Sequence, residues 1–284
     1  MRISQNEKLL ATLILLSIFL IFLQSVSFKE YVSAQDSIKC YICGKDIPPD
    51  KLHELPSDIT GERKFYCDNC FKTLPMCFFC GLLVKPGILP LSDGRHICAD
   101  CLKNAVIEYK DVKAIYDEVV AISYRFLERR IKFVPPLYII NQKQYKEHKE
   151  RCSGSKPFTI FDLGYYNCDR QIYVNGIIEA RNPVICVIYG LPKDEMFDVV
   201  AHEFGHAWYF ENCPPNQSEE IVEGFAQWVA YKEMIIKGDY NREINIQLKR
   251  DDVYGTGLRK FISIENSGGI SAVLKYVKAQ GYTR

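Results

Sequence analysis

The chain of 284 residues has almost no excess of charge and few histidines. Lysine and arginine (36 residues) nearly balance aspartate and glutamate (35), which leaves a formal net charge of +1. Charge therefore indicates no acidic or basic partner, and no basic stripe of the kind that binds nucleic acid is present. The sequence also lacks a phosphate-binding loop and an internal repeat. Apolar residues make up 48% of the chain, which supports true hydrophobic cores, and the length allows two modest domains.

Two of the five histidines, His202 and His206, lie four residues apart. On a helix, residues at this spacing point from the same face and can hold one zinc ion, with Glu203 beside the open coordination position. A zinc-bound water has a pKa near ~7, so this carboxylate could take its proton at neutral pH. That chemistry is typical of a zinc peptidase. The alternative is a surface helix that carries the motif by chance.

The residues around the motif favour a half-buried helix. Pro192 precedes it, and the acidic Asp194 and Glu195 suit the first turn of a helix. A stripe of apolar residues at helical spacing would face the core: Phe197, Val200, Phe204 and Ala207. Because unpaired imidazole rings are costly to bury, the context favours a zinc site over a chance match.

A second helix is predicted downstream, from a capping-box-like start at Asn216 to a stop at Gly238. Its Glu223 is the expected third zinc ligand. One turn further, Gln227 could accept the second ring N–H of a zinc-binding histidine, although it could equally be a surface residue. The rival ligands lie at the helix start, where solvated carboxylates are expected anyway: Glu219 and Glu220.

Residues 1–34 resemble a targeting segment. A short uncharged apolar run, Leu9 to Leu23, follows Arg2 and Lys8 and is too short for a comfortable membrane span. The positive charge before the run predicts that the rest of the chain lies outside the cytoplasm. A signal peptide cleaved near Ala34 and an uncleaved membrane anchor both fit. We therefore expect an extracytoplasmic protein, either membrane-anchored or secreted.

Eight of the 12 cysteines form four C-x-x-C pairs between residues 38 and 103. A long, a short and a long gap separate the pairs, which predicts two sequential structural zinc sites of four thiolates each. The first would use Cys40, Cys43, Cys67 and Cys70, and the second Cys77, Cys80, Cys98 and Cys101. Disulfides, which an extracytoplasmic location would favour, and a crossed pairing of the modules are the alternatives.

The region between the cysteines and the zinc motif reads as one helix followed by strands. Apolar residues at helical spacing predict a long amphipathic helix within residues 104–131, ended by Pro135-Pro136. Apolar runs predict strands at 137–140, 158–161, 171–174 and 184–189, with turns at Gly164, Asn175-Gly176 and Gly190. The last strand leads into the zinc helix and, as an edge strand, could bind a peptide substrate by strand addition.

The C-terminal part contains Tyr254 in a predicted glycine-bounded turn, followed by a helix at 270–278. The tyrosine hydroxyl could stabilise the oxyanion of a tetrahedral intermediate, or the ring could simply pack on the core. Four cysteines remain outside the pairs and could form two disulfides, although one of them, Cys186, fits a plain core position: Cys152, Cys168, Cys186 and Cys213.

These residues form an ordered set that resembles the LIM-domain peptidases related to the plant organ-size regulator DA-one. The similar stretches are Ser92-Asp93-Gly94-Arg95 leading to Cys98-Ala99-Asp100-Cys101, Ile188-Tyr189-Gly190-Leu191-Pro192, Ala201 to Trp208, Glu223-Gly224 with Gln227, and Val253 to Gly257 with Arg259. The resemblance runs from about Cys77 to the C-terminus.

The resemblance implies a zinc-dependent endopeptidase with a gluzincin-like site that follows a zinc-finger module. The zinc ligands would be His202, His206 and Glu223, and the catalytic carboxylate Glu203. The sequence departs from the family in its hydrophobic N-terminus, in Cys67 where a LIM finger typically has histidine, and in lacking an evident ubiquitin-interacting helix. Ubiquitin regulation and the family's substrates are therefore not carried over.

The combined prediction is an α+β fold. A signal peptide or anchor (1–34) and a LIM-like double zinc-knuckle domain (35–103) would precede a gluzincin-like peptidase domain (104–284) with a small sheet, an active-site helix and a second ligand helix. The cofactors would be one catalytic and two structural zinc ions. The expected partners are a protein or peptide substrate, a protein docked on the LIM-like domain, and the membrane if residues 1–34 are retained; no nucleic acid is expected. Two alternatives stay open: an interaction module with a relic peptidase fold, and a cysteine domain that latches over the cleft.

Overall fold

The computed structural model describes residues 38–57, 60–128, 130–152, 163–172, 178–215, 217–238 and 248–279. The chain falls into two compact units, one of Met1–Leu55 with Arg63–Thr73 and one of Pro56–Glu62 with Leu74–Arg284. The second cysteine group and the histidine motif thus belong to the same unit. The predicted segment 1–34, the strand at 158–161, the turn at Asn175-Gly176 and the helix start at Asn216 lie outside the described residues. The predicted domain limits stay predictions.

The first unit is built around its cysteines. Its elements are η2 (Pro49–Lys51), β1 (Leu52–Pro56), β2 (Arg63–Cys67) and α2 (Asp68–Thr73), and the two strands form a small sheet. Cys40 and Cys43 lie in a tight turn that Gly44 closes, because its N–H donates to the Cys40 carbonyl at 2.9 Å. Gly44 has a φ of 71°, in the left-handed region that favours glycine. The other cysteine pair lies where β2 meets α2.

The second cysteine group repeats this construction inside the larger unit. Gly81 donates its N–H to the Cys77 carbonyl at 3.1 Å, as Gly44 does to Cys40. The helix α3 (Ala99–Lys103) begins after Cys98, whose sulfur accepts the N–H of Cys101 at 3.5 Å. The short strand β3 (Ala105–Val106) follows and pairs antiparallel with β7 (Leu191–Pro192), which directly precedes the histidine helix.

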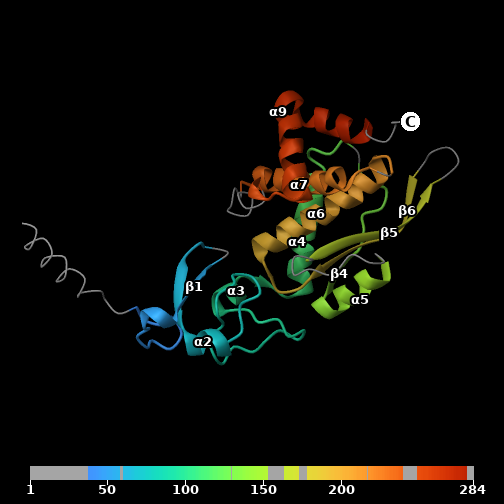
Figure 1. The fold of residues 1–284 in the computed structure, drawn as a ribbon. Coiled ribbons are helices and arrows are strands. Elements are labelled where there is room, and N and C mark those ends of the chain that lie inside the picture. The colour runs from blue at the N-terminus through green and yellow to red at the C-terminus, as the bar shows by residue number, and fades with distance from the viewer. Residues whose placement is uncertain are drawn as a thin grey trace, which may run out of the picture. The chain divides into compact units, whose positions relative to one another are not determined.

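A three-stranded sheet forms the centre of the larger unit (Figure 1). The order is β4 (Leu137–Ile140), β6 (Ile178–Ile188) and β5 (Gly164–Ile172), with β4 parallel and β5 antiparallel to β6. The strand predicted at 137–140 is confirmed. The prediction that 184–189 is an edge strand is wrong, because β6 is the central strand and its Ile185, Val187 and Ile188 are fully buried. A run buried on both faces is apolar throughout, which periodicity alone cannot assign to an edge or a centre.

Five helices complete the larger unit in the part of it that the structure describes: α4 (Tyr109–Ser123), α5 (Gln142–Cys152), α6 (Lys193–Asn212), α7 (Glu219–Lys237) and α9 (Val253–Ala279). Figure 1 shows α6 and α7 on one face of the sheet and α5 on the other. Aromatic side chains form the core of the helical layer: Trp208, Phe225, Trp228 and Phe261 are all fully buried. The predicted stop at Gly238 is confirmed, since this residue ends α7 with a φ of 86°.

Two helices differ from the prediction. The helix expected within 104–131 ends at Ser123, well before Pro135, because the chain then turns inward and buries Phe126 and Leu127. Tyr254 lies in the first turn of α9 and not in a loop, and the helix expected at 270–278 is the part of α9 beyond a break at Gly268 and Gly269.

The glycines around Tyr254 serve helix packing and not a turn. A Cβ atom on Gly257 would lie 2.5 Å from the Cα of Gly224 on α7, so both positions must lack a side chain for α7 and α9 to approach. The side chain of Asp252 accepts the N–H of Gly255 at 3.1 Å and thereby helps to begin the helix.

Glu233 of α7 is fully buried against Ser123 of α4. The Ser123 hydroxyl donates to Oε1, while Oε2 has no hydrogen-bond partner among the described residues. Burial raises the pKa of Glu233 well above its ordinary value despite the serine bond, and the nearby carboxylate of Glu118 raises it further. The folded protein therefore keeps this carboxyl protonated at pH values where the unfolded chain ionises it.

A substitution of Glu233 by glutamine tests this assignment through the pH dependence of stability. Because the folded-state pKa is raised, the wild-type carboxyl contributes fully to the free energy of unfolding below its unfolded-state pKa of about 4.3. That contribution to stability is lost as pH rises through the folded-state pKa. Urea unfolding should show the stability of Glu233→Gln, relative to wild type, increasing from pH 4 to pH 8. A constant difference over this range would contradict the assignment, and Ser267→Ala, at an exposed position, is the control.

Candidate metal centre

Three ligand-type side chains converge from two helices. His202 and His206 lie on α6 and Glu223 lies on α7. The Nε2 atoms of the two histidines are 3.0 Å apart. Oε2 of Glu223 lies 3.3 Å from Nε2 of His202 and 3.2 Å from Nε2 of His206. The rival residues Glu219 and Glu220 are in the first turn of α7, and Glu220 pairs instead with Lys260 at 3.0 Å.

The spacing of these atoms fits a zinc ion. Nitrogen and oxygen ligands about 2.0–2.1 Å from zinc in a tetrahedral arrangement are about 3.3 Å from one another. The three observed distances of 3.0, 3.3 and 3.2 Å match that value. The donor set of two imidazoles and one carboxylate leaves a fourth position for a water or substrate, as in catalytic zinc sites.

Gln227 lies behind the first histidine. Its side chain is buried, and its Oε1 atom is 3.1 Å from Nδ1 of His202. With a proton on Nδ1, the glutamine oxygen accepts it and Nε2 is left to face the metal position. Gln227 lies on α7, one turn beyond Glu223, and its role behind the histidine stays a prediction.

Glu203 is almost completely buried between α6 and the edge of the sheet. A Cβ atom on Gly164 of β5 would lie 3.1 Å from its Cγ and 3.2 Å from its Oε1, so the strand passes directly over the carboxylate. Burial raises the pKa of Glu203, while the nearby histidines and the backbone of Tyr166 act in the opposite direction. A carboxylate with a raised pKa is a better proton acceptor at neutral pH.

Tyr254 lies beside the same group. Its ring centroid is 5.9 Å from that of His202, and the guanidinium of Arg250 lies 4.9 Å from the tyrosine ring centroid. The helix α9 therefore brings the tyrosine to the histidines by a route other than the predicted turn.

The charges in the centre depend on one another. Burial alone would lower the pKa of His202, but the carboxylates of Glu223 and Glu203 raise it to about 8. For Glu223, burial would raise the pKa, and the two histidines lower it well below its ordinary value. In the absence of a metal, a proton on the His202 imidazole offsets part of the negative charge in the centre. A divalent cation would take over that role.

The eight paired cysteines form two groups with spacing that suits zinc. The structure places Cys40, Cys43, Cys67 and Cys70 in one group and Cys77, Cys80, Cys98 and Cys101 in the other. Thiolates about 2.3 Å from a tetrahedral zinc are about 3.8 Å apart. The sulfur atoms of Cys43 and Cys67 are 3.8 Å apart and those of Cys80 and Cys98 are 3.7 Å apart, far longer than a disulfide bond.

The pKa values of the thiols in each cysteine group depend on the neighbouring groups. Burial would raise the pKa of Cys40, but backbone N–H groups of Cys43 and Cys67 lower it to about 6. In the second group, hydrogen bonds with Cys101 and Cys80 lower the pKa of Cys77, and hydrogen bonds with Cys77 and Cys80 raise that of Cys101. Such different pKa values of neighbouring thiols are expected where four thiols meet and a cation would neutralise the thiolate charge.

Sequence reasoning missed the contribution of β5. Gly164 was predicted as a turn, yet it begins a strand, and its missing side chain lets the strand lie against Glu203. Tyr145 of α5 holds this glycine in place, because its hydroxyl donates to the Gly164 carbonyl at 2.7 Å. No spacing rule connects these residues to the zinc motif.

Three relatives illustrate the comparison with known proteins. Protein DA1-related 1 of Arabidopsis thaliana is 25% identical over 219 residues, which cover 68% of this chain and 39% of the relative. Protein DA1 of the same plant is 22% identical over 219 residues, covering 68% of this chain and 41% of the relative. The LIM domain-containing protein HDR3 of Oryza sativa subsp. japonica is 21% identical over 218 residues, which cover 68% of this chain and 43% of the relative. No family model and no solved structure matches.

The chain is a relative of the DA1 and DA1-related proteins. The resemblance found in the motifs is thereby confirmed, and the chain spans about 40 to 50% of the length of the curated relatives it matches. One relative carries a LIM domain in its name, and none of the names states an enzymatic activity. The comparisons with the DA1 proteins, together with the three ligand groups, support a zinc-binding α+β protein.

The predicted extracytoplasmic location, membrane-anchored or secreted, is wrong. Within the described ranges, no helix is long and apolar enough to cross a membrane. The relatives are named as DA1 and LIM-domain proteins and not as secreted or anchored ones. The prediction rested on residues 1–34, which lie outside the described ranges.

Metal analysis of the purified protein tests the three groups. We expect about three zinc ions per chain in wild type and about two in His202→Ala and Glu223→Ala, because each substitution removes a ligand from the three-ligand site only. Glu219→Ala, a change on the same helix, should keep about three. Equal zinc content in wild type and Glu223→Ala, measured by mass spectrometry of metals, would exclude this glutamate as a ligand.

Proposed function

We propose that the protein is a zinc-dependent endopeptidase with a gluzincin-like site. The observation that carries the proposal is the position of Glu203, a buried carboxylate with a raised pKa on the same helix as two convergent histidines. A purely structural zinc site has four protein ligands and no need of such a base. Here three ligands and a spare carboxylate occur together.

The residues have distinct roles in this proposal. Zinc held by His202, His206 and Glu223 would supply a Lewis acid that polarises a peptide carbonyl and acidifies water. Glu203 accepts the proton of the attacking water and passes it to the leaving amine. Gln227 fixes the orientation of His202 through the contact at 3.1 Å.

The sheet offers a place for the substrate. With β6 in the centre, β5 is the outer strand of the described sheet on the side of Glu203. An extended peptide that added to β5 would run past the carboxylate, since main-chain hydrogen bonding is the usual basis of strand addition. This replaces the strand-addition role expected for 184–189.

A second candidate is an interaction module that keeps a peptidase fold without the activity. It is favoured by the names of the relatives, which describe a LIM domain and no enzyme. In that case the cysteine groups would present a surface to a partner protein, and Glu203 would have no function in chemistry.

A Glu203→Gln variant separates the two. Removal of a general base typically lowers the rate by about 10²–10⁴-fold, so we expect loss of hydrolysis of an unfolded protein substrate such as denatured casein, with zinc content unchanged. Glu219→Gln is the matched control and should retain the wild-type rate. Equal cleavage by wild type and a folded, zinc-loaded Glu203→Gln protein would exclude the catalytic role, and no cleavage by wild type would favour the interaction module.

Tyr254→Phe tests the second catalytic residue of the proposal. Placed beside His202, the tyrosine hydroxyl would donate to the developing oxyanion, and removal of one such donor costs on the order of 10²-fold in kcat. We expect a fall of that order in kcat with KM and zinc content little changed. A variant with the wild-type kcat would assign the ring to packing alone.

A further inference from the structure

A turn of the second cysteine group contains a buried ion pair that no step of the proposed chemistry uses. The side chains of Asp93 and Arg95 are 0% and 3% exposed, and Nε of Arg95 donates to Oδ2 of Asp93 at 2.8 Å. The guanidinium also lies 5.2 Å from the ring centroids of both Phe78 and Tyr189. A buried pair adds little stability over apolar residues of similar size, so its value lies in the geometry that it imposes.

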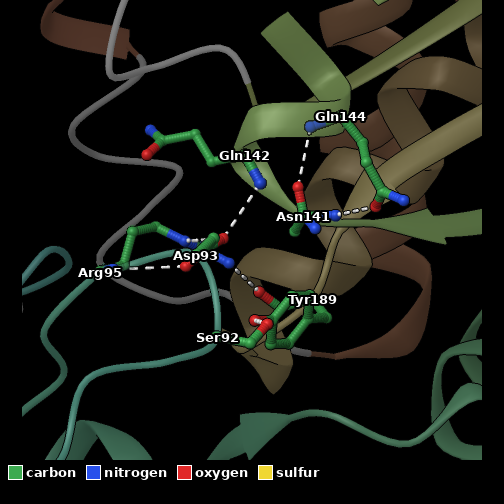
Figure 2. Close-up of polar contacts among 7 residues, drawn as sticks. All are labelled: Ser92, Asp93, Arg95, Asn141, Gln142, Gln144 and Tyr189. Carbon is green, nitrogen blue, oxygen red and sulfur yellow. Dashed lines mark hydrogen bonds and ion pairs between the residues drawn. The ribbon is translucent and has the colours of Figure 1, made fainter. Parts of the chain in front are cut away.

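Arg95 reaches the corner between the central strand and the histidine helix (Figure 2). Its Nη2 donates to the carbonyl of Tyr189 at 2.8 Å, immediately after β6 ends. The hydroxyls of Ser92 and Tyr189 are 2.6 Å apart. A Cβ atom on the next residue, Gly190, would lie 2.9 Å from a methyl group of Leu91, so the corner and the turn are in direct contact.

The chain that follows the cysteines holds the remainder of the corner. Gly190 donates its N–H to the carbonyl of Val106 at 2.7 Å, and Lys193, the first residue of α6, donates to that of Asn104 at 3.0 Å. Asn104 ends α3, the helix that contains Cys101. Asn104, which accepts the hydrogen bond from the start of the histidine helix, thus lies three positions after a cysteine of the second group.

Asp93 reaches the other side of the candidate site. Its Oδ2 accepts the N–H of Gln142 at 3.0 Å, the first residue of α5, while Asn141 and Gln144 complete the helix start by reciprocal bonds (Figure 2). A carboxylate at this position is stabilising because it faces the positive end of the helix dipole. Tyr145 of the same helix bonds to the Gly164 carbonyl, beside Glu203.

We propose that Arg95 and Asp93 are positioning residues for the candidate metal centre, and that the second cysteine group is a structural part of it. The strands β4 and β6 are parallel, so α5 and α6, which follow them, both begin near the carboxyl ends of these strands. The ion pair binds the backbone at the start of α5 and at Tyr189, between the end of β6 and the start of α6, and so sets where the histidines of α6 lie relative to β5 and Glu203. This proposal rests on the proposed function, because peptide hydrolysis would depend on the position of the histidines relative to Glu203.

Two measurements on Arg95→Lys test the proposal in the full chain. Lysine keeps the buried charge but cannot bond to Asp93 and the Tyr189 carbonyl together as the planar guanidinium does. We expect faster hydrogen–deuterium exchange across residues 189–206, and binding of Co²⁺ at the histidine site on the order of 10-fold weaker with an altered absorption spectrum. The separate thiolate-to-cobalt bands of the cysteine groups show that these sites are still formed. Lys103→Gln, at a side chain 73% exposed on the same module, is the matched control.

The outcomes are distinguishable from those of the proposed function because neither measurement depends on hydrolysis. Asp93→Asn should reproduce both effects, and it decides the matter if Arg95→Lys is poorly folded. Unchanged exchange across 189–206 in both variants would overturn the positioning role. A variant that loses the thiolate-to-cobalt bands but keeps the wild-type hydrogen–deuterium exchange across 189–206 and the wild-type cobalt affinity at the histidine site would also overturn it. A wild-type histidine site that binds no cobalt would contradict the proposed function, while the exchange measurement would still test the positioning role.

Discussion

The close contact between α6 and α7 is the constraint on which the candidate site depends. A Cβ atom on Gly205 would lie 2.9 Å from the Cα of Ala226, so the two helix backbones nearly touch beside His206. A Cβ atom on Gly224 of α7 would lie even closer, 2.5 Å from the Cα of Gly257 on α9. These contacts fix both the separation and the rotation of α7, and thereby bring Glu223 within 3.2–3.3 Å of both histidines.

That packing creates an electrostatic cost that a cation would relieve. The site gathers the buried carboxylate of Glu203 and the partly buried carboxylate of Glu223 next to two imidazoles in a mostly apolar helical layer. Without a metal, the balance requires protonation of His202, whose pKa is raised to about 8. Buried charges persist in proteins when they are paired or bind metals, and a ligand set already drawn together reduces the reorganisation on binding. The Glu203 carboxylate stays outside the ligand set and so remains able to accept a proton.

The sequence predicted the residues that carry local signals and missed those that depend on tertiary contacts. The histidine spacing, the apolar stripe of α6, Gly238 and the four cysteine pairs each follow from short-range geometry. The central position of β6 and the start of β5 at Gly164 do not, because strand order and close approach are set by partners distant in the chain. Tyr254 was a candidate because its neighbouring glycines predicted a turn, whereas those glycines serve contact between helices.

The contacts of the second cysteine group also bear on the idea that it latches over the cleft. A latch must release at a small cost, which favours solvated and replaceable contacts. The Asp93–Arg95 pair is instead buried, and it bonds to the backbone at the start of α5 and at Tyr189, in the corner that leads from β6 to α6. To separate it from Tyr189 and Gln142 would leave a buried carboxylate and guanidinium without their backbone partners, which is costly in a low-dielectric interior. This group is therefore better understood as a fixed support of the centre, in which a bound zinc ion would stabilise the turn and helix that contact the chain leading into the histidine helix.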